Sequence, residues 1–353
     1  MNEGLFGIAY GAVLKAFRQR VKSGQGASQQ YSECVVLGTT DTTSPMSRST
    51  GAGAPAADVC DLVLQVPYAI GRYGQAVTAS GALSLQIPDG KITGGNRRGN
   101  GAVDLQMSRA AASNVASGAG AFIAGGASNT ASGTNSVALG ASSTATNTAS
   151  VALGSSASAT GLGAIALGQS AIASGTRNFA AGWSVNAAGS GSTALGQHSF
   201  DRGINNTFAF SGAQRAAVGD RQFLKRPQAT VTTNATTTTL TSDGGAEATT
   251  NTWVLPNNYT GIYNGWIVAR NTANNDSKGW RFEGMVSRDA SAATVALLGA
   301  ATITDVGTAD AGMASVTLAV GVNTTNGSLI VQGTGLAATT IAWAGFLDCV
   351  ENG

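Results

Sequence analysis

The feature that most constrains this chain is a fourteen-residue repeat in its middle third. Four-residue words ending in glycine recur at this spacing, at residues 123–126, 137–140, 151–154, 165–168, 179–182 and 193–196. Six coils can therefore be written between about residues 116 and 200. A fixed period of this kind is the signature of a repeat architecture, in which each unit stacks on its neighbours to build a continuous core.

Several columns of the repeat hold small residues. An alanine stands two places before the glycine in every coil, and another stands five places after it in all but the last. Seven places after the glycine stand Gly133, Asn147, Gly161, Gly175 and Gly189. Two Gly or Asn columns half a repeat apart predict two turns with positive φ per coil, and hence two short strands. The prediction is a parallel β-solenoid that rises about 4.8 Å per coil, with alanine filling its thin interior.

Other columns hold large apolar residues, because the Val-Ala-Leu word alternates with a period of two. The Val or Ile position and the Leu position face one side of the strand, and the invariant alanine faces the other. We predict that the large residues form the repeat core: Ile123, Val137, Leu139, Val151, Leu153, Ile165, Leu167, Phe179 and Leu195. One thin coil cannot bury them, so we expect several chains to pack around a symmetry axis. The alternative is a disordered Ala/Ser/Gly linker, and the strict register argues against it.

The same residues carry a resemblance to a known family. The pattern Asn-Ser-Val-Ala-Leu-Gly at residues 135–140 resembles the head repeat of trimeric autotransporter adhesins, whose fold is a trimeric left-handed parallel β-roll. The lead-in at residues 96–106 and the pattern at 113–118 resemble the variant found in bacteriophage tail-fibre proteins. The adhesins carry a secretion signal and a C-terminal membrane anchor. We expect neither in this chain, and that departure favours the phage side of the resemblance.

The first 95 residues are predicted to form an attachment domain. Residues 4–22 follow helical spacing, and basic residues gather near the end of this predicted helix, where the helix dipole favours them. Short strand candidates between residues 31 and 95 predict a small β domain after the helix. The resemblance to phage fibres implies that the helix contacts another virion protein, through Phe6, Tyr10, Phe17, Arg18 and Arg20. The alternative is an amphipathic helix that packs on its own domain.

Charged and aromatic residues return after Phe200. Short segments of mixed alternation, separated by Asn, Gly and Asp turns, predict an antiparallel β-sandwich over residues 221–353. Its predicted core residues are Trp253, Trp266, Trp280, Phe282, Trp343 and Phe346. Amides beside an aromatic face suit sugars, which makes one loop a candidate receptor contact: Asn271, Asn274, Asn275, Asp276, Lys278 and Trp280. A plain hairpin loop is the alternative.

The composition disfavours nucleic-acid binding and most catalysis. Only 11% of the residues are charged, the formal net charge is +2, and residues 110–176 contain no Asp, Glu, Lys or Arg. The chain thus lacks the basic face that displaces counterions from nucleic acid. His198 is the single histidine and has no catalytic motif near it, while Cys34, Cys60 and Cys349 lack the spacing of a zinc site. We expect free thiols, no metal, no cofactor and no catalytic residue.

Two further expectations concern glycan cleavage and membranes. Some phage tailspikes cleave glycans with two acids, and the carboxylates available for such a pair are Asp276, Glu283, Asp289, Asp305 and Asp310. We expect these to be solvated turn residues rather than catalytic acids. No stretch reaches the roughly 18 apolar residues of a membrane span, and the first residues lack a signal peptide's basic start.

Together these observations predict an all-β, non-enzymatic virion protein: a homotrimeric phage tail fibre. It would comprise an attachment domain (1–95), a β-roll shaft (96–220) and a β-sandwich tip (221–353). Its partners would be two further copies of itself, a tail adaptor, nozzle or other virion protein, and a host cell-surface glycan or protein. Assembly in the host cytoplasm is expected, without nucleic acid or membrane insertion. The alternatives are a capsid head fibre or decoration trimer, a glycan-depolymerising tailspike and a bacterial surface adhesin.

Overall fold

The computed structural model of the chain describes residues 17–23, 30–36, 83–84 and 88–353. The chain divides into two compact units, Met1–Gln75 and Ala76–Gly353. The described residues are all-β: apart from the short 3₁₀ helices η2 (Ala292–Thr294) and η3 (Ala311–Met313), they contain strands, turns and loops. Over this same part of the chain, no helix is long and apolar enough to cross a membrane.

In the first unit, two antiparallel strands are described, β1 (Phe17–Ser23) and β2 (Gln30–Val36). The helix predicted over residues 4–22 is therefore wrong in its described part. In this segment the basic residues Arg18, Arg20 and Lys22 occupy every second position. That period suits a strand, and it outweighs the wider helical spacing of the large apolar residues.

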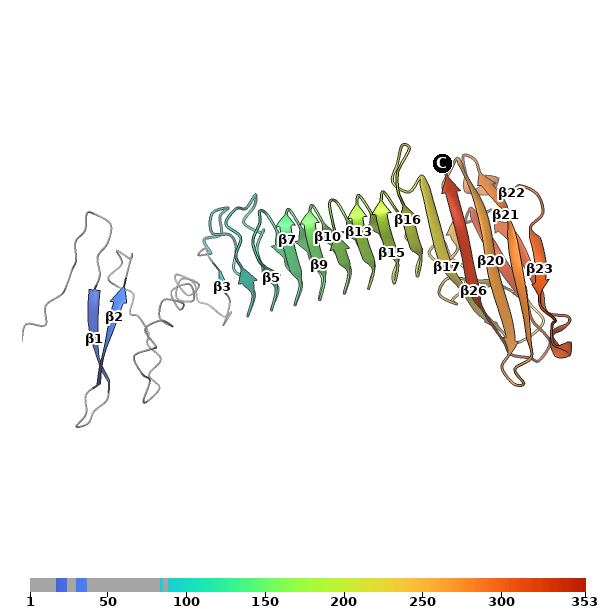
Figure 1. The fold of residues 1–353 in the computed structure, drawn as a ribbon, viewed down its shortest axis with the longest axis horizontal. Coiled ribbons are helices and arrows are strands. Elements are labelled where there is room, and N and C mark those ends of the chain that lie inside the picture. The colour runs from blue at the N-terminus through green and yellow to red at the C-terminus, as the bar shows by residue number, and fades with distance from the viewer. Residues whose placement is uncertain (1–16, 24–29, 37–82, 85–87) are drawn as a thin grey trace, which may run out of the picture. The chain divides into compact units, whose positions relative to one another are not determined.

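The second unit begins with a stack of coils that form two parallel sheets (Figure 1). The first sheet contains β3 (Leu83–Ser84), β4 (Val103–Asp104), β5 (Phe122–Ile123), β7 (Val137–Ala141), β9 (Val151–Ser155), β11 (Ile165–Leu167), β13 (Phe179–Trp183), β15 (Thr193–Gln197) and β16 (Phe208–Ser211). The second contains β6 (Thr130–Ala131), β8 (Thr144–Ala145), β10 (Ser158–Ala159), β12 (Ile172–Ala173) and β14 (Asn186–Ala187). The predicted β-solenoid is confirmed.

Alanine fills the interior of these coils. The alanines of the Val-Ala-Leu words pair with one another along the first sheet, and the second alanine column pairs along the second sheet. All are fully buried: Ala138, Ala152, Ala166, Ala180 and Ala194 from one column, and Ala131, Ala145, Ala159, Ala173 and Ala187 from the other. The two sheets thus face each other across methyl groups, as the narrow repeat predicts.

The prediction for the turns is right for one glycine column and wrong for the other. The glycines that end the words, such as Gly154, have positive φ. Those of the second column, such as Gly161, do not. A Cβ on Gly161 would lie 1.9 Å from the carbonyl oxygen of Gly175 in the next coil, so this column needs glycine for close backbone approach. The second turn takes its positive φ elsewhere, for example at Asn135 and Ala149.

The coils are not all fourteen residues long. Phe122 pairs with Val137, and Val103 pairs with Phe122, so coil length grows toward the N-terminal end. Because of this one-residue change in register, Ile123 lies in the buried alanine column. Its predicted place in the outward Val column is therefore wrong. At the C-terminal end of the stack, Thr193 pairs with Phe208. This pairing adds one further coil, which the fourteen-residue repeat did not predict.

The first sheet continues without a break into the C-terminal region. After β16 come β17 (Arg221–Thr232), β26 (Ile341–Asn352), β20 (Tyr259–Asn271), β21 (Ser277–Arg288) and β22 (Ala296–Leu297), with β23 (Thr302–Val306) also paired to β21. A second antiparallel sheet contains β18 (Thr237–Leu240), β25 (Ser328–Thr334), β19 (Trp253–Val254) and β24 (Thr317–Asn323). The chain therefore passes from parallel coils to long antiparallel strands within one hydrogen-bonded sheet.

Aromatic side chains are buried among these C-terminal strands. Trp253, Trp343 and Phe282 are buried, and the Trp280 ring stacks on Trp343 with 5.6 Å between ring centroids. A Cβ on Gly333 of β25 would lie 2.8 Å from the Trp343 ring, so glycine there lets the indole reach the facing sheet. Trp266 is a correction to the predicted core, because it points out of the sheet and remains 45% exposed. Phe346 is only partly buried.

Candidate interaction surface

The outward face of the first sheet in the coils carries the predicted repeat-core residues. They are half-buried in the single chain, in contrast to the fully buried alanines between them: Val137, Leu139, Val151, Leu153, Ile165, Leu167, Phe179 and Leu195. Ile123 alone among the predicted set lies inside the coil. The structure thus brings these residues together in two parallel columns on one face, one column of Val, Ile or Phe and one mainly of Leu.

The opposite face of the coils is more polar. The outward positions of the second sheet are Thr130, Thr144, Ser158, Ile172 and Asn186, and they pair in register from one coil to the next. Hydroxyl groups at these positions can hydrogen-bond to water, whereas the Val and Leu side chains are stabilised when they are removed from water. The two faces of one coil therefore differ in chemistry, and the first sheet is the candidate interaction surface.

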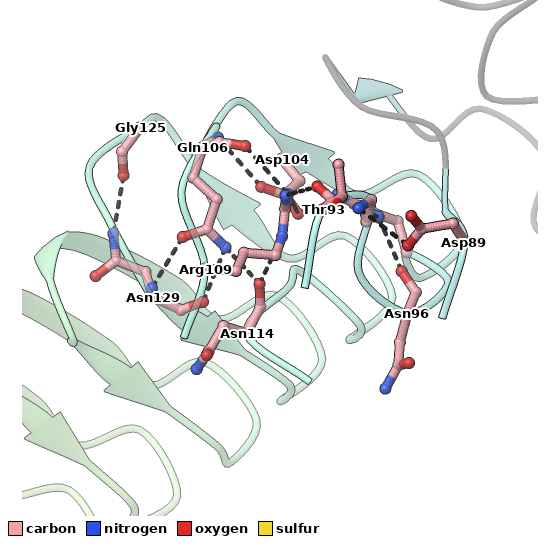
Figure 2. A network of polar contacts seen from close by, with 11 residues as sticks. Asp89, Thr93, Asn96, Asp104, Gln106, Arg109, Asn114, Gly125 and Asn129 are labelled. Carbon is pink, nitrogen blue, oxygen red and sulfur yellow. Dashed lines mark hydrogen bonds and ion pairs between the residues drawn. The ribbon is translucent and has the colours of Figure 1, made fainter. Parts of the chain in front are cut away.

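A buried polar network lies within the N-terminal coils of the described stack (Figure 2). Asp104 occupies the inward column, where it pairs across the strands with Ile123. Its Oδ2 accepts from Arg98 Nε at 2.9 Å and from Arg109 Nη2 at 3.2 Å. All three residues are buried. The longer coils at this end enclose a wider interior, which long polar side chains fill in place of alanine.

Amide side chains extend this network to the regular coils. Gln106 Nε2 donates to the carbonyl oxygens of Asn114 and Asn129, at 2.7 and 2.9 Å, and Gln106 Oε1 accepts from the Asn129 amide at 2.8 Å. Asn129 in turn donates to the Gly140 carbonyl at 2.7 Å. Burial lowers the pKa of Arg98, although the Asp104 carboxylate opposes that shift. The network fills the interior of these coils, and its groups bond to one another and to backbone carbonyls.

A second buried cluster lies where the coils meet the C-terminal strands. Glu351 Oε1 accepts from Trp253 Nε1 at 2.7 Å, and its Oε2 accepts from Gln222 Nε2 at 2.8 Å and from Arg202 Nη2 at 3.0 Å. Burial by itself lowers the pKa of Arg202, but the Glu351 carboxylate and the Tyr259 hydroxyl together outweigh it, and the pKa is raised. Nearby, burial lowers the pKa of Arg226 to about 10.

The candidate receptor loop is the turn between β20 and β21. Asn274 and Asn275 are exposed, while Asn271, Asp276 and Lys278 are partly buried. The amides bond within the loop: Asn271 Oδ1 accepts from the Ala273 amide at 2.9 Å, and Asn274 Nδ2 donates to Asp276 Oδ2 at 2.9 Å. These contacts are those of a closed hairpin turn.

Trp280 is a correction to this candidate site, because only 2% of it is exposed and its ring stacks inside the domain. The ammonium of Lys278 lies 5.2 Å from the Trp280 ring centroid and donates to the Val316 carbonyl at 3.1 Å. The face of Trp280 is thus not available to a sugar beside the loop amides. The sequence could have shown this, since Trp280 and Phe282 alternate with Arg281 along β21.

Three of the carboxylates considered for glycan cleavage have polar partners. Asp310 accepts from the Ser277 amide at 2.7 Å, Asp305 lies 3.6 Å from Lys278, and Glu283 pairs with Arg281 at 2.6 Å. Among the residues that the structure describes, no group of three His, Cys, Asp or Glu could hold a metal ion. His198 is buried, with its ring centroid 4.8 Å from that of Trp183. Cys349 is a buried free thiol whose pKa burial raises.

The predicted attachment residues belong to the first unit. Phe6 and Tyr10 lie outside the described residues, and Phe17, Arg18 and Arg20 lie in β1. Of residues 1–75 the structure describes only β1 and β2, and the predicted virion contact stays a prediction. Sequence reasoning also missed Phe208 and Phe210, which extend the outward columns by one coil. Their Phe-Ala-Phe alternation was the available signal.

Comparison with known proteins matches this repeat. Residues 131–157 and 159–184 each match the YadA head domain repeat. The coils are therefore a β-roll shaft like that of trimeric autotransporters, and such repeats suggest an adhesin-like fibre. No curated protein sequence matches the chain.

Two solved structures show limited similarity. The first is the tailspike protein gp49 of the Acinetobacter baumannii bacteriophage Fri1, described as a capsular polysaccharide depolymerase, with 11% identity, a TM-score of 0.22, and coverage of 75% of this chain and 44% of that one. The second is the tailspike protein of Acinetobacter phage vB_ApiP_P1, with 10% identity, a TM-score of 0.17, and coverage of 66% and 50%. The chain thus spans half or less of the length of either protein.

Proposed function

We propose that this chain is a non-enzymatic structural virion protein that forms a homotrimeric phage tail fibre. Its N-terminal domain would dock on a tail adaptor, nozzle or other virion protein. Its C-terminal domain, a β-sandwich tip, would contact a glycan or protein on the host surface. Binding through three linked tips would convert weak contacts into useful avidity. Such a fibre would be assembled in the host cytoplasm and would end in the virion tail.

The observation that carries the proposal is the contrast between the two faces of the coils. One face holds half-buried Val, Ile and Leu columns along the whole regular stack, and the other holds mainly hydroxyl and amide groups. A contiguous apolar surface of this kind marks a protein interface. Three copies around an axis would bury it without leaving an open edge. The match to the YadA head domain repeat supports the same arrangement.

The trimer is tested by sedimentation equilibrium of the purified full chain. We expect three times the chain mass of 35.0 kDa. Replacement of Leu153 by Asp in the outward column should lower that mass, because it would place a charge in the subunit interface. Thr144→Asp, on the polar face, is the matched control and should leave the trimer intact. Sedimentation of the unchanged chain at monomer mass would refute the proposal.

Host contact and the absence of catalysis are tested separately. Labelled trimer should bind host cells, and binding should leave the envelope glycans at their original length. Release of sugar fragments would favour a glycan-depolymerising tailspike. Failure to bind cells, together with binding to capsids, would favour a capsid head fibre or decoration trimer. Localisation on a bacterial surface rather than in the virion would favour an adhesin, which the matched repeat also supports.

A further inference from the structure

A single row of apolar residues runs through ten strands of the first sheet and crosses from the coils into the C-terminal strands. Each member pairs in register with the next: Leu139, Leu153, Leu167, Ala181, Leu195, Phe210, Phe223, Val350, Ile262 and Met285. In Figure 1, strands β15, β16, β17, β26 and β20 follow one another in this order. We call this set the apolar row.

The members of the apolar row all face the same side of the sheet, because paired residues in neighbouring strands point the same way. Their neighbours in sequence form the inward row, which pairs in the same order and is buried at Ala194, Ala209, Leu224, Cys349 and Tyr263. Inward side chains thus grow from alanine to tyrosine as the interior widens. The outward row stays apolar throughout.

In the C-terminal domain the apolar row is substantially exposed in the single chain. Ile262 and Val350 are each 53% exposed and Met285 is 41% exposed, while Phe223 is partly buried. Phe210, in the last coil of the shaft, is 49% exposed. The next row becomes charged there, with Lys225 paired across the strands to Asp348. Beyond that charged row the same face also exposes Val231, Trp266 and Val268. The apolar row itself is aligned with the columns of the shaft.

We propose that the C-terminal part of the apolar row is a subunit interface, covered by a second copy of this chain. The proposal rests on the homotrimer proposed above, and it extends the subunit contact from the shaft into the tip. The row crosses nine strand intervals, which corresponds to about 43 Å at ~4.8 Å each. Copies related by an axis along the stack present the same row at the same heights, so they can cover it from end to end.

A host receptor fits this surface less well. It would have to bind an apolar row that continues the outward columns of the shaft. Those columns are already assigned to contacts with other subunits. The proposal therefore assigns host contact to other parts of the C-terminal domain, such as its loops. It also predicts that the tips are held together, so that each trimer presents one composite end rather than three independent ones.

The test is thiol accessibility in the full chain. Ile262→Cys and Met285→Cys place a thiol in the row, and Ala319→Cys places one at an exposed position of β24 in the other sheet. Each variant is first checked for trimer mass by sedimentation, then treated with a maleimide, and labelling is measured on the peptide that contains the new cysteine. Buried Cys349 serves as an internal check of folding.

We expect both row thiols to react roughly tenfold or more slowly than Ala319→Cys in the trimer, and all three at the same rate in denaturant. A trimer in which the row thiols react as fast as the control would overturn this inference and leave the proposed fibre standing. A monomer of the unchanged chain would overturn both. Row thiols that are free in the trimer but protected on host cells would overturn it in favour of a receptor contact.

Discussion

Replacement of Glu351 by Ala should destabilise the junction between shaft and C-terminal domain. The carboxylate is fully buried and accepts from Trp253, Gln222 and Arg202. Alanine would leave all three donors without this acceptor. Breaking a buried ion pair by removing one partner costs about 3–5 kcal/mol, because the other charge stays buried.

The expected loss lies toward the lower end of that range. The Arg202 side chain is 13% exposed, so solvent can reach part of it, and it also donates to the Gly219 carbonyl. We therefore expect about 3 kcal/mol. At roughly 2–4 °C per kcal/mol for a domain of this size, the midpoint of thermal unfolding should fall by about 6–12 °C.

The assay is thermal unfolding followed by circular dichroism and tryptophan fluorescence at one fixed protein concentration, because the midpoint of an oligomer depends on concentration. Glu283→Ala is the matched control, since Glu283 pairs with Arg281 at the surface. That exposed pair is worth less than about 1 kcal/mol. If Glu351→Ala and Glu283→Ala shift the midpoint equally, the assignment of Glu351 as the central acceptor is refuted.

Three further outcomes follow. Gly154→Ala should unfold the shaft at a lower temperature, since its Cβ would lie 2.1 Å from the Gly168 carbonyl oxygen at a φ of +143°; Ser155→Ala on the same strand should not. Asp104→Ala should cost about 3–5 kcal/mol in denaturant unfolding, because two buried guanidiniums lose their shared carboxylate; an unchanged midpoint would contradict this. Burial would raise the pKa of Asp220, but amide donors including those of Ala216 and Ala217 lower it from 3.8 to about 2. Its contribution is thus fully present above pH 3.8 and lost as pH falls toward 2, and Asp220→Asn should flatten the acid side of a stability–pH profile.

The interior of the shaft was predictable from the sequence because each coil repeats the same small residue at the same place. Ala152 is buried for the reason that its column suggests. The slip at Ile123 was not predictable from the fourteen-residue register, because the coils before it are longer and only the strand pairing reveals their lengths. The fourteen-residue register therefore predicts which residues are buried in the regular coils, and it fails for coils of other lengths.

The glycine columns show a second limit to what the sequence could predict. Gly154 and Gly161 look equivalent in sequence, and a Cβ on either would meet a carbonyl oxygen of the next coil, yet only Gly154 also has positive φ. Both demands select glycine. Likewise, the burial of Glu351 depends on Arg202, 149 positions earlier, and no local pattern signals that pair. The exposure of Trp266 was readable in principle, since β20 alternates strictly between buried and exposed residues.

The unbroken sheet from β3 to β22 has a mechanical consequence. Strands lie across the stack, so tension along it pulls neighbouring strands apart rather than sliding them past one another. Every interstrand ladder in a chain then carries the same load in series, and the shortest ladder yields first. The pairing of β4 with β5 has two residue pairs and that of β5 with β7 has one, whereas the pairing of β17 with β26 has twelve. Under tension, rupture should therefore begin at the N-terminal coils. In these coils the strands are short, and the buried Asp104 network connects their loops.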